Sequence, residues 1–365
     1  MKSIKKLLTS LAAALVLTGC EPIGVDMSSY DCRPVMSTEV SQTEIYATLV
    51  KEFENNNTSV VFNGSVDLNV LEECIGKVHN KYPEFFWCYS YVIYENADFV
   101  RCDFNAGGNY TPETISQMRA EIKSAADRII AGMPANLDDF GKILYIHDYI
   151  AENTVYADDK TQIDALGSWD TSYGCLVEGE AICGGYSDAF TYIMRLLGID
   201  SGVVKGITFD EYGAQRGHVW NYVVLNGRYY WIDLTWDDTD DAVNPVVHSY
   251  FLIDDLRLKN NHIISSGQYF VPSCFSMDDN YFVRYESYIT VYTPNAVAEA
   301  IASAPEAGTL ELMFADKSSY DNALTGLFEN EELWGLSANS GVGGTVSYMT
   351  NDDVYTISIK YYTNP

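Results

Sequence analysis

The sequence predicts an α+β protein, because helical and strand patterns occupy separate stretches of its central part. Amphipathic helical patterns cover much of residues 111–197. Two strand-forming runs follow over 218–225 and 228–235, and the turn Asn226-Gly227 between them is typical of an antiparallel hairpin. The expected architecture is a helix that packs on an antiparallel sheet, flanked by smaller α/β modules.

Residues 1–19 have the features of a signal peptide. Three lysines precede an apolar run, Leu7–Leu17, which is too short to cross a bilayer. The run ends in Leu17-Thr18-Gly19-Cys20, which resembles the lipobox of bacterial lipoproteins. That resemblance implies cleavage before Cys20 and a lipid on its thiol. An ordinary secretory signal with an incidental cysteine is the alternative.

The lipid on Cys20 would hold the protein at the membrane surface without spanning it. Residues 20–43 are polar and turn-rich, and we expect them to form a tether. The predicted location is therefore a cell membrane lipoprotein exposed outside the cytoplasm.

The chain is strongly acidic. Without the three lysines of the expected signal peptide, 19 basic residues remain against 51 acidic ones, a formal charge of −32. Nucleic-acid binding needs clustered Lys and Arg, so we expect no nucleic-acid partner.

Before and after the central region, short elements predict two small modules, residues 44–110 and 285–365. The first should contain helices from residue 44 and over 66–82, and strands over 59–62, 85–93 and 99–104. The second should contain strands over 288–292, 310–314 and within 346–362, and helices over 294–303 and 320–336.

Residues 111–280 form the predicted catalytic core. Thr111 followed by Pro112 is typical of a helix start. Helices are expected over 111–133, 137–152 and 183–197, and strands at 203–204 and in the hairpin.

Cys183 lies where a loop becomes the third of these helices, in the motif Cys183-Gly-Gly-Tyr. The start of a helix stabilises a thiolate, which makes this cysteine a candidate nucleophile. A buried structural cysteine is the alternative from this motif alone.

The hairpin adds a histidine and a carboxylate. A two-residue turn pairs Leu225 with Arg228, and continuing that register places His218 and Asp233 diagonally on one face. Thiol acyl-transfer chemistry needs this set: an imidazole that takes the thiol proton, and a carboxylate that orients the imidazole. The Cys183 amide is one expected oxyanion donor, and Tyr156 and Tyr173 are weak candidates for the other.

Three segments, Cys183-Gly-Gly-Tyr, Gly217-His-Val-Trp-Asn and Tyr230-Trp-Ile-Asp-Leu-Thr-Trp, resemble the core motifs of the transglutaminase-like superfamily, which is related to papain-like thiol proteases. The resemblance implies that Cys183 is the nucleophile, His218 the base and Asp233 the orienting acid. One departure is Gly184, where a larger residue is common.

The remaining polar groups are expected to be structural. No CxxC pair or histidine-rich run is present, so neither a metal site nor a cofactor is predicted. His147, His248 and His262 should have packing or loop roles. The acidic run over 237–241 lacks the Gly and Glu of a calcium-binding loop and should be a solvated turn.

The predicted function is a cysteine enzyme that acts on amide bonds of a peptide or protein substrate, by hydrolysis. Transfer of the acyl group to an amine is one alternative, and a catalytically weak surface-binding module is another. A disulfide between Cys175 and Cys183 would silence the thiol.

Overall fold

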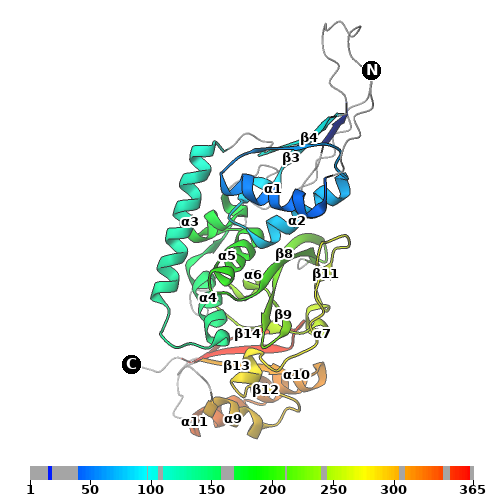
Figure 1. The fold of residues 1–365 in the computed structure, drawn as a ribbon. Helices are drawn as coiled ribbons and strands as arrows, with labels where there is room; N and C mark the ends of the chain where they lie inside the picture. Colours follow the sequence, from blue (N-terminus) through cyan, green and yellow to red (C-terminus); the bar gives the residue numbers. More distant parts are fainter. Residues whose placement is uncertain are drawn as a thin grey trace, which may run out of the picture.

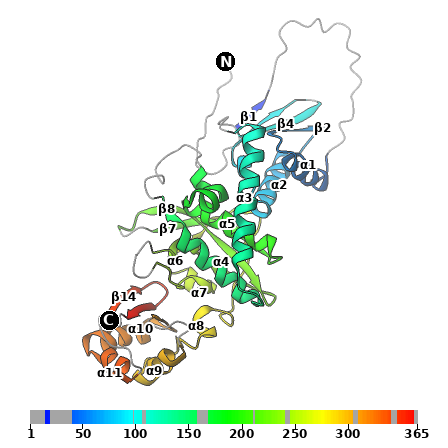
Figure 2. The same ribbon diagram turned by 90° about the vertical axis from the view of Figure 1, so that its left-hand side faces the viewer.

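The computed structural model describes residues 15–18, 40–96, 98–105, 110–157, 168–209, 212–239, 245–303, 309–339 and 346–361. Helices and sheets are mixed in the α+β arrangement that the sequence predicts. Figures 1 and 2 show the N-terminal module at one end, the central region in the middle and the C-terminal module at the other end. Cys20 and Cys32 lie outside the described residues, so the predicted lipidation site stays a prediction.

The N-terminal module is a four-stranded sheet with two helices packed together. Its strand order is β1-β3-β4-β2, and β1 lies within the segment expected to be a signal peptide. A capping box at Ser41 and a cap at Asp67 start the helices. The elements are β1 (Leu15–Thr18), α1 (Gln42–Glu54), β2 (Ser59–Asn63), α2 (Leu68–Lys81), β3 (Tyr91–Glu95) and β4 (Phe99–Phe104).

One prediction in this module is partly wrong. The aromatic run over 85–93 is a strand only in its second half, because Phe86–Tyr89 forms a 3-10 turn. Three of its side chains, Phe86, Trp87 and Cys88, are buried together in that turn. In this segment, the aromatic and β-branched composition therefore indicates burial rather than a strand.

The central sheet has five strands in the order β10-β9-β8-β7-β11, and each pair of adjacent strands is antiparallel. The predicted hairpin is formed by β8 and β9, two neighbouring inner strands, with Asn226 and Gly227 both at positive φ. The strands are β7 (Ser201–Phe209), β8 (Gln215–Leu225), β9 (Arg228–Ile232), β10 (Phe251–Ile253) and β11 (Ile263–Ile264).

Helices cover this sheet, and α5 packs directly on β7 and β8. The long helix α3 runs along the side of the N-terminal module and the central region (Figure 1). The helices are α3 (Pro112–Gly132), α4 (Asp139–Asn153), α5 (Cys183–Leu196), α6 (Leu234–Asp237), α7 (Asp255–Leu258) and α8 (Tyr281–Arg284). Short elements before α5 are β5 (Val155–Tyr156), a 3-10 turn (Ser168–Asp170), a π-helical turn (Gly174–Glu178) and β6 (Glu180–Ala181).

The C-terminal module has its own sheet, in the order β12-β13-β15-β14, and its own hydrophobic core. The helix predicted over 320–336 is interrupted by a π-helical turn, Thr325–Glu329. The elements are β12 (Tyr288–Ile289), α9 (Pro294–Ser303), β13 (Thr309–Phe314), α10 (Lys317–Leu324), α11 (Glu332–Asn339), β14 (Val346–Asn351) and β15 (Thr356–Tyr361).

A single hydrophobic core continues from the N-terminal module through the central region. Polar contacts also join these parts: Asn80 Nδ2 donates to the Val203 carbonyl at 2.7 Å, and the Tyr89 hydroxyl donates to the Asp188 carboxylate. Of the helices described, none has both the length and the apolar character that a membrane span requires.

Candidate active site

Cys183 is the first residue of α5, as the sequence predicts. The residue before it, Ile182, has no side chain that could cap the helix. The first amide groups of α5 therefore lack a side-chain cap, and their dipoles favour negative charge at the helix start. From β8, the Asn221 amide donates to the Ser187 carbonyl at 3.0 Å and the Thr191 hydroxyl at 2.9 Å, which holds α5 against the sheet.

His218 lies on β8, and its Nε2 is 2.7 Å from Asp233 Oδ2. The pairing Leu225 to Arg228 agrees with the predicted register, which continues to Asn221 and Ile232. The predicted pair is therefore in contact.

The local structure of Asp233 differs from the prediction. The strand β9 ends at Ile232, and Asp233 is the N-cap of α6. Its Oδ1 accepts from the amides of Thr235 and Trp236 at 3.1 and 3.3 Å, while Oδ2 faces the histidine. The expected continuation of the strand to residue 235 is wrong, since the backbone turns into a helix where this carboxylate offers a cap.

Sequence reasoning missed His262, which is buried next to the same carboxylate. Its Nε2 lies 3.0 Å from Asp233 Oδ2. The residue precedes β11, where Ile264 pairs with Gly206, and Gly206 pairs in turn with His218. No local motif signals this contact, because it depends on the position of an edge strand.

The charges around His218 stabilise its protonated form. Burial alone would lower the pKa of His218, but the Asp233 charge, the hydrogen bond to Asp233 and a hydrogen bond with Cys183 together raise it to about 10. Despite its burial, the pKa of Asp233 is held well below its usual range, first by His218 and then by His262. With Nε2 committed to Asp233, Nδ1 is the ring nitrogen left for Cys183. An imidazolium beside a thiol favours the thiolate.

The remaining cysteines among the described residues are buried free thiols. Burial raises the pKa of Cys88, Cys102 and Cys175 to about 12, and it raises the pKa of Cys74 and Cys274 as well. Cys175 lies 3.4 Å from the Thr154 hydroxyl and is not paired with Cys183.

A steric constraint explains why residue 184 is a glycine in this structure. A Cβ at this position would overlap the carboxylate of Asp170, which lies against the start of α5. Burial, followed by the nearby charge of Asp188, raises the pKa of Asp170 to about 7. The glycine therefore makes room for a carboxyl group that is partly protonated at neutral pH.

Two further expectations concern polar groups near the site. The Tyr173 hydroxyl donates to Glu121 at 2.7 Å, so it is engaged away from the thiol, and Tyr156 packs near the Tyr186 ring. The solvated turn expected over 237–241 is wrong for Asp237, which is fully buried and lies 3.2 Å from His147 Nε2.

Residues 123–235 match the family model described as the transglutaminase-like superfamily. This stretch contains Cys183, His218 and Asp233, and the match confirms the resemblance inferred from the three motifs. No curated protein matches the sequence.

Similar solved structures include a TGase, at 16% identity over 42% of this chain and 45% of that chain, with a TM-score of 0.29. A candidate cysteine protease from Cytophaga hutchinsonii matches at 14% identity, over 42% of this chain and 58% of that chain, with a TM-score of 0.26. The periplasmic domain of TgpA from Pseudomonas aeruginosa matches at 15% identity, over 38% and 55% of the two chains, with a TM-score of 0.25. The chain spans about half the length of these solved proteins.

Proposed function

We propose that this chain, which carries a transglutaminase-like domain, is a lipid-anchored cysteine enzyme that hydrolyses amide bonds of peptides or proteins outside the cytoplasm. Cys183 is the nucleophile, His218 exchanges protons with it, and Asp233 orients the histidine. The observation that carries the proposal is a thiol at an uncapped helix start that helps to raise the pKa of a histidine, which a buried carboxylate already holds.

In the first half of the reaction, the Cys183 thiolate attacks the amide carbonyl carbon. The oxygen becomes an oxyanion, which the Cys183 amide N–H at the start of α5 stabilises. The His218 imidazolium then gives its Nδ1 proton to the amide nitrogen. The carbon–nitrogen bond breaks, the amine leaves, and a thioester remains on Cys183.

In the second half, neutral His218 takes a proton from water, and the resulting hydroxide attacks the thioester carbon. The carbon–sulfur bond breaks, which releases a carboxylic acid and restores the thiolate–imidazolium pair. An amine in place of water would give acyl transfer through the same steps. Asp233 stays ionised throughout and fixes Nε2 as a donor.

Selective alkylation tests the nucleophile. We expect iodoacetamide at pH 6 to modify Cys183 at least about 10-fold faster than a free thiol, whose thiolate is scarce at that pH. The other described cysteines should react slowly, because they are buried and their pKa values are raised. Peptide mapping by mass spectrometry identifies the modified residue.

The matched control is Cys175→Ser, which removes a buried thiol near α5 and should leave the fast labelling in place. His218→Gln should abolish it, because the imidazolium is lost. If Cys183 reacts no faster than a free thiol at pH 6, or is found oxidised, the proposed enzyme is wrong in this form.

A fluorogenic peptide library, with and without a primary amine, tests the acceptor. Hydrolysis predicts release of the free acid even when the amine is present at millimolar concentration. If the amide of the added amine is the main product, the enzyme is an acyltransferase. If the labelling is fast but no peptide turns over, the site does not act on peptides.

The membrane anchor needs its own test. Cys20→Ser should move the protein from the membrane fraction to the soluble fraction and remove incorporated fatty acid, without changing alkylation of Cys183. Membrane association that persists in Cys20→Ser would contradict lipidation at this residue.

A further inference from the structure

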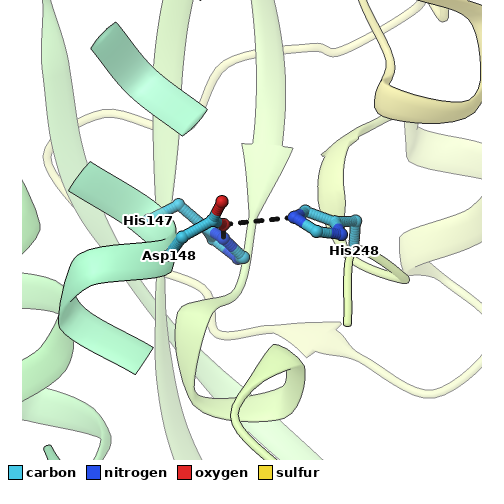
Figure 3. Close-up of side chains that lie close together, drawn as sticks. All are labelled: His147, Asp148 and His248. Atoms are coloured by element: carbon cyan, nitrogen blue, oxygen red, sulfur yellow. Dashed lines mark hydrogen bonds and ion pairs between the residues drawn. The ribbon is translucent and has the colours of Figure 1, made fainter. Parts of the chain in front are cut away.

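A second cluster of histidine and carboxylate groups lies on the side of the central region that faces the C-terminal module. His147 and Asp148 come from α4, and His248 comes from the segment before β10. His147 Nδ1 lies 2.8 Å from Asp148 Oδ1, and His248 Nε2 lies 3.1 Å from the same oxygen. Figure 3 shows the three side chains converging from these two elements.

We propose that these three side chains bind a zinc ion. The ligands are His147 Nδ1, His248 Nε2 and a carboxylate oxygen of Asp148, and they all lie within 4.8 Å of one another. Two imidazoles and one carboxylate are a donor set that suits zinc. Zinc bonds of about 2.0–2.2 Å place tetrahedral ligand atoms roughly 3.3 Å apart. The two histidine nitrogens lie 2.8 and 3.1 Å from Asp148 Oδ1, which is close to that separation.

The outward nitrogens of both histidines are held by further carboxylates. His147 Nε2 lies 3.2 Å from Asp237 Oδ2, and His248 Nδ1 lies 2.7 Å from Glu311 Oε1. Metal-binding histidines usually donate their second N–H to such a partner, which fixes the ring and aims the other nitrogen at the metal. Here both rings are held in this way with their other nitrogens directed at the same oxygen, Asp148 Oδ1.

Neighbouring groups fix the rings and leave a route to the site. The His248 ring stacks on Tyr281 with centroids 3.8 Å apart and planes 1° from parallel. A cavity of about 190 Å³ is lined by Asp148, Glu152, His248 and Glu311 among others. The Asp148 side chain keeps 34% exposure, whereas that of His147 has none. The ion can therefore enter from the cavity, and a water can be its fourth ligand.

The ion would join parts of the chain that are distant in sequence. His248 is hydrogen-bonded to Glu311 on β13 of the C-terminal module, while Asp148 and His147 belong to the central region. Zinc bound there would help to fix the docking of the C-terminal module, because its ligands belong to the central region and the supporting carboxylate of Glu311 belongs to the C-terminal module.

The alternative is a hydrogen-bond network in which protons take the place of the metal. Direct titration separates the two, and Cys183→Ala is the right background because a thiol beside His218 can also bind zinc. We expect the tag-free, metal-stripped protein to bind one equivalent of Zn²⁺ against a chromophoric chelator at pH 7.5. Anomalous diffraction at the zinc edge should place the ion between Asp148 and His248.

Variants locate the site. Asp148→Asn should weaken zinc binding by more than about 100-fold, and Glu311→Gln, which alters only a supporting contact, by about 10–100-fold. The matched control is His262→Gln in the other histidine cluster, which should bind zinc as the parent does. Circular dichroism checks that each variant is folded. If Asp148→Asn does not fold, the zinc affinity of Glu311→Gln decides the test.

The proposal is overturned if no stoichiometric zinc binds at micromolar concentration. It is also overturned if Asp148→Asn and Glu311→Gln bind zinc as the parent does, or if His262→Gln abolishes binding. These readouts do not use catalysis, so failure here leaves the proposed enzyme intact, and failure of the enzyme leaves zinc binding intact.

Discussion

Two aspartates in this protein are each held between two histidines through a single carboxylate oxygen. The distances to Asp233 Oδ2 are 2.7 Å from His218 and 3.0 Å from His262. Around Asp148 Oδ1 the corresponding distances are 2.8 Å from His147 and 3.1 Å from His248. The two arrangements use the same residue types at nearly the same separations.

They differ in what lies beyond the histidines. In the Asp233 cluster, the Cys183 thiol helps to raise the pKa of His218, and the second oxygen of the aspartate caps α6. In the Asp148 cluster, both outer nitrogens face carboxylates, and the aspartate opens onto a cavity. A thiol partner prepares proton transfer, whereas carboxylate partners prepare the rings to bind a cation. If both proposals hold, the outer partner decides the chemistry of this shared arrangement.

The sharpest test of that difference removes the thiol. Cys183→Ala should lower kcat/KM for a peptide substrate by at least about 10⁴-fold, because no acyl-enzyme can form. Cys175→Ser should retain activity within about threefold. Steady-state kinetics on the best peptide of the library measures both, and substantial turnover by Cys183→Ala would mean that the nucleophile is another group.

The two central aspartates should respond very differently to the same substitution. Asp233→Asn should lower kcat by about 10³-fold, because an amide no longer fixes the tautomer of His218 or stabilises its imidazolium. Asp148→Asn makes the same chemical change in the other cluster and should leave kcat within about threefold. Equal losses in the two variants would break the comparison.

The pH dependence of stability is a second test of the Asp233→Asn variant. The pKa of His218 is raised from its ordinary value of 6.5 to about 10, so the protonated histidine stabilises the folded state fully below pH 6.5. That contribution is lost as the pH rises from 6.5 toward 10. Urea unfolding at several pH values should show this decline in the parent protein and a smaller one in Asp233→Asn.

A smaller effect is expected at His262, which acts on Asp233 rather than on substrate. Burial lowers the pKa of His262, so we expect a neutral ring that donates its Nε2 proton to the carboxylate. His262→Gln should lower kcat by about 10-fold and leave KM nearly unchanged. Because a support of the ionised Asp233 is lost, the acidic limb of the kcat–pH profile should also move to higher pH. An unchanged pH profile would indicate a packing role alone.

The sequence allowed Cys183 to be placed at a helix start and His218 to be placed next to Asp233, because local rules govern these positions. A helix start places Cys183, and the turn at Asn226-Gly227 sets the register that brings His218 to Asp233. The predicted contact forms even though the strand was expected to continue past Asp233. The strand β9 ends before Asp233, but as the cap of α6 its carboxylate still lies within hydrogen-bond distance of His218. Turn chemistry and capping act over a few residues and can be recognised in sequence.

The contacts that could not be predicted depend on tertiary structure. His262 reaches Asp233 only because β11 pairs with β7, and His248 meets Asp148 across 100 residues of sequence. Neither pattern has the close spacing of a metal or catalytic motif, so the sequence indicated no metal site. Asp237 was expected in solvent because it begins an acidic run, but it is buried against His147.

The smallest expected effect concerns the Asp170 carboxyl group beside the start of α5, which has no counterpart in the Asp148 cluster. The pKa of Asp170 is raised from 3.8 to about 7, so the folded state binds a proton that the unfolded state has released between these values. Stability should therefore fall as the pH rises from 4 to 7. Because Asp170 is buried only in part, water screens the effect, and we expect a change of about 1 kcal/mol. Asp170→Asn should remove it, as urea unfolding at pH 4.5 and 7 would measure. An identical pH dependence in the variant would mean that Asp170 is ionised in the folded protein, and that Gly184 makes room for a charge rather than for a neutral acid.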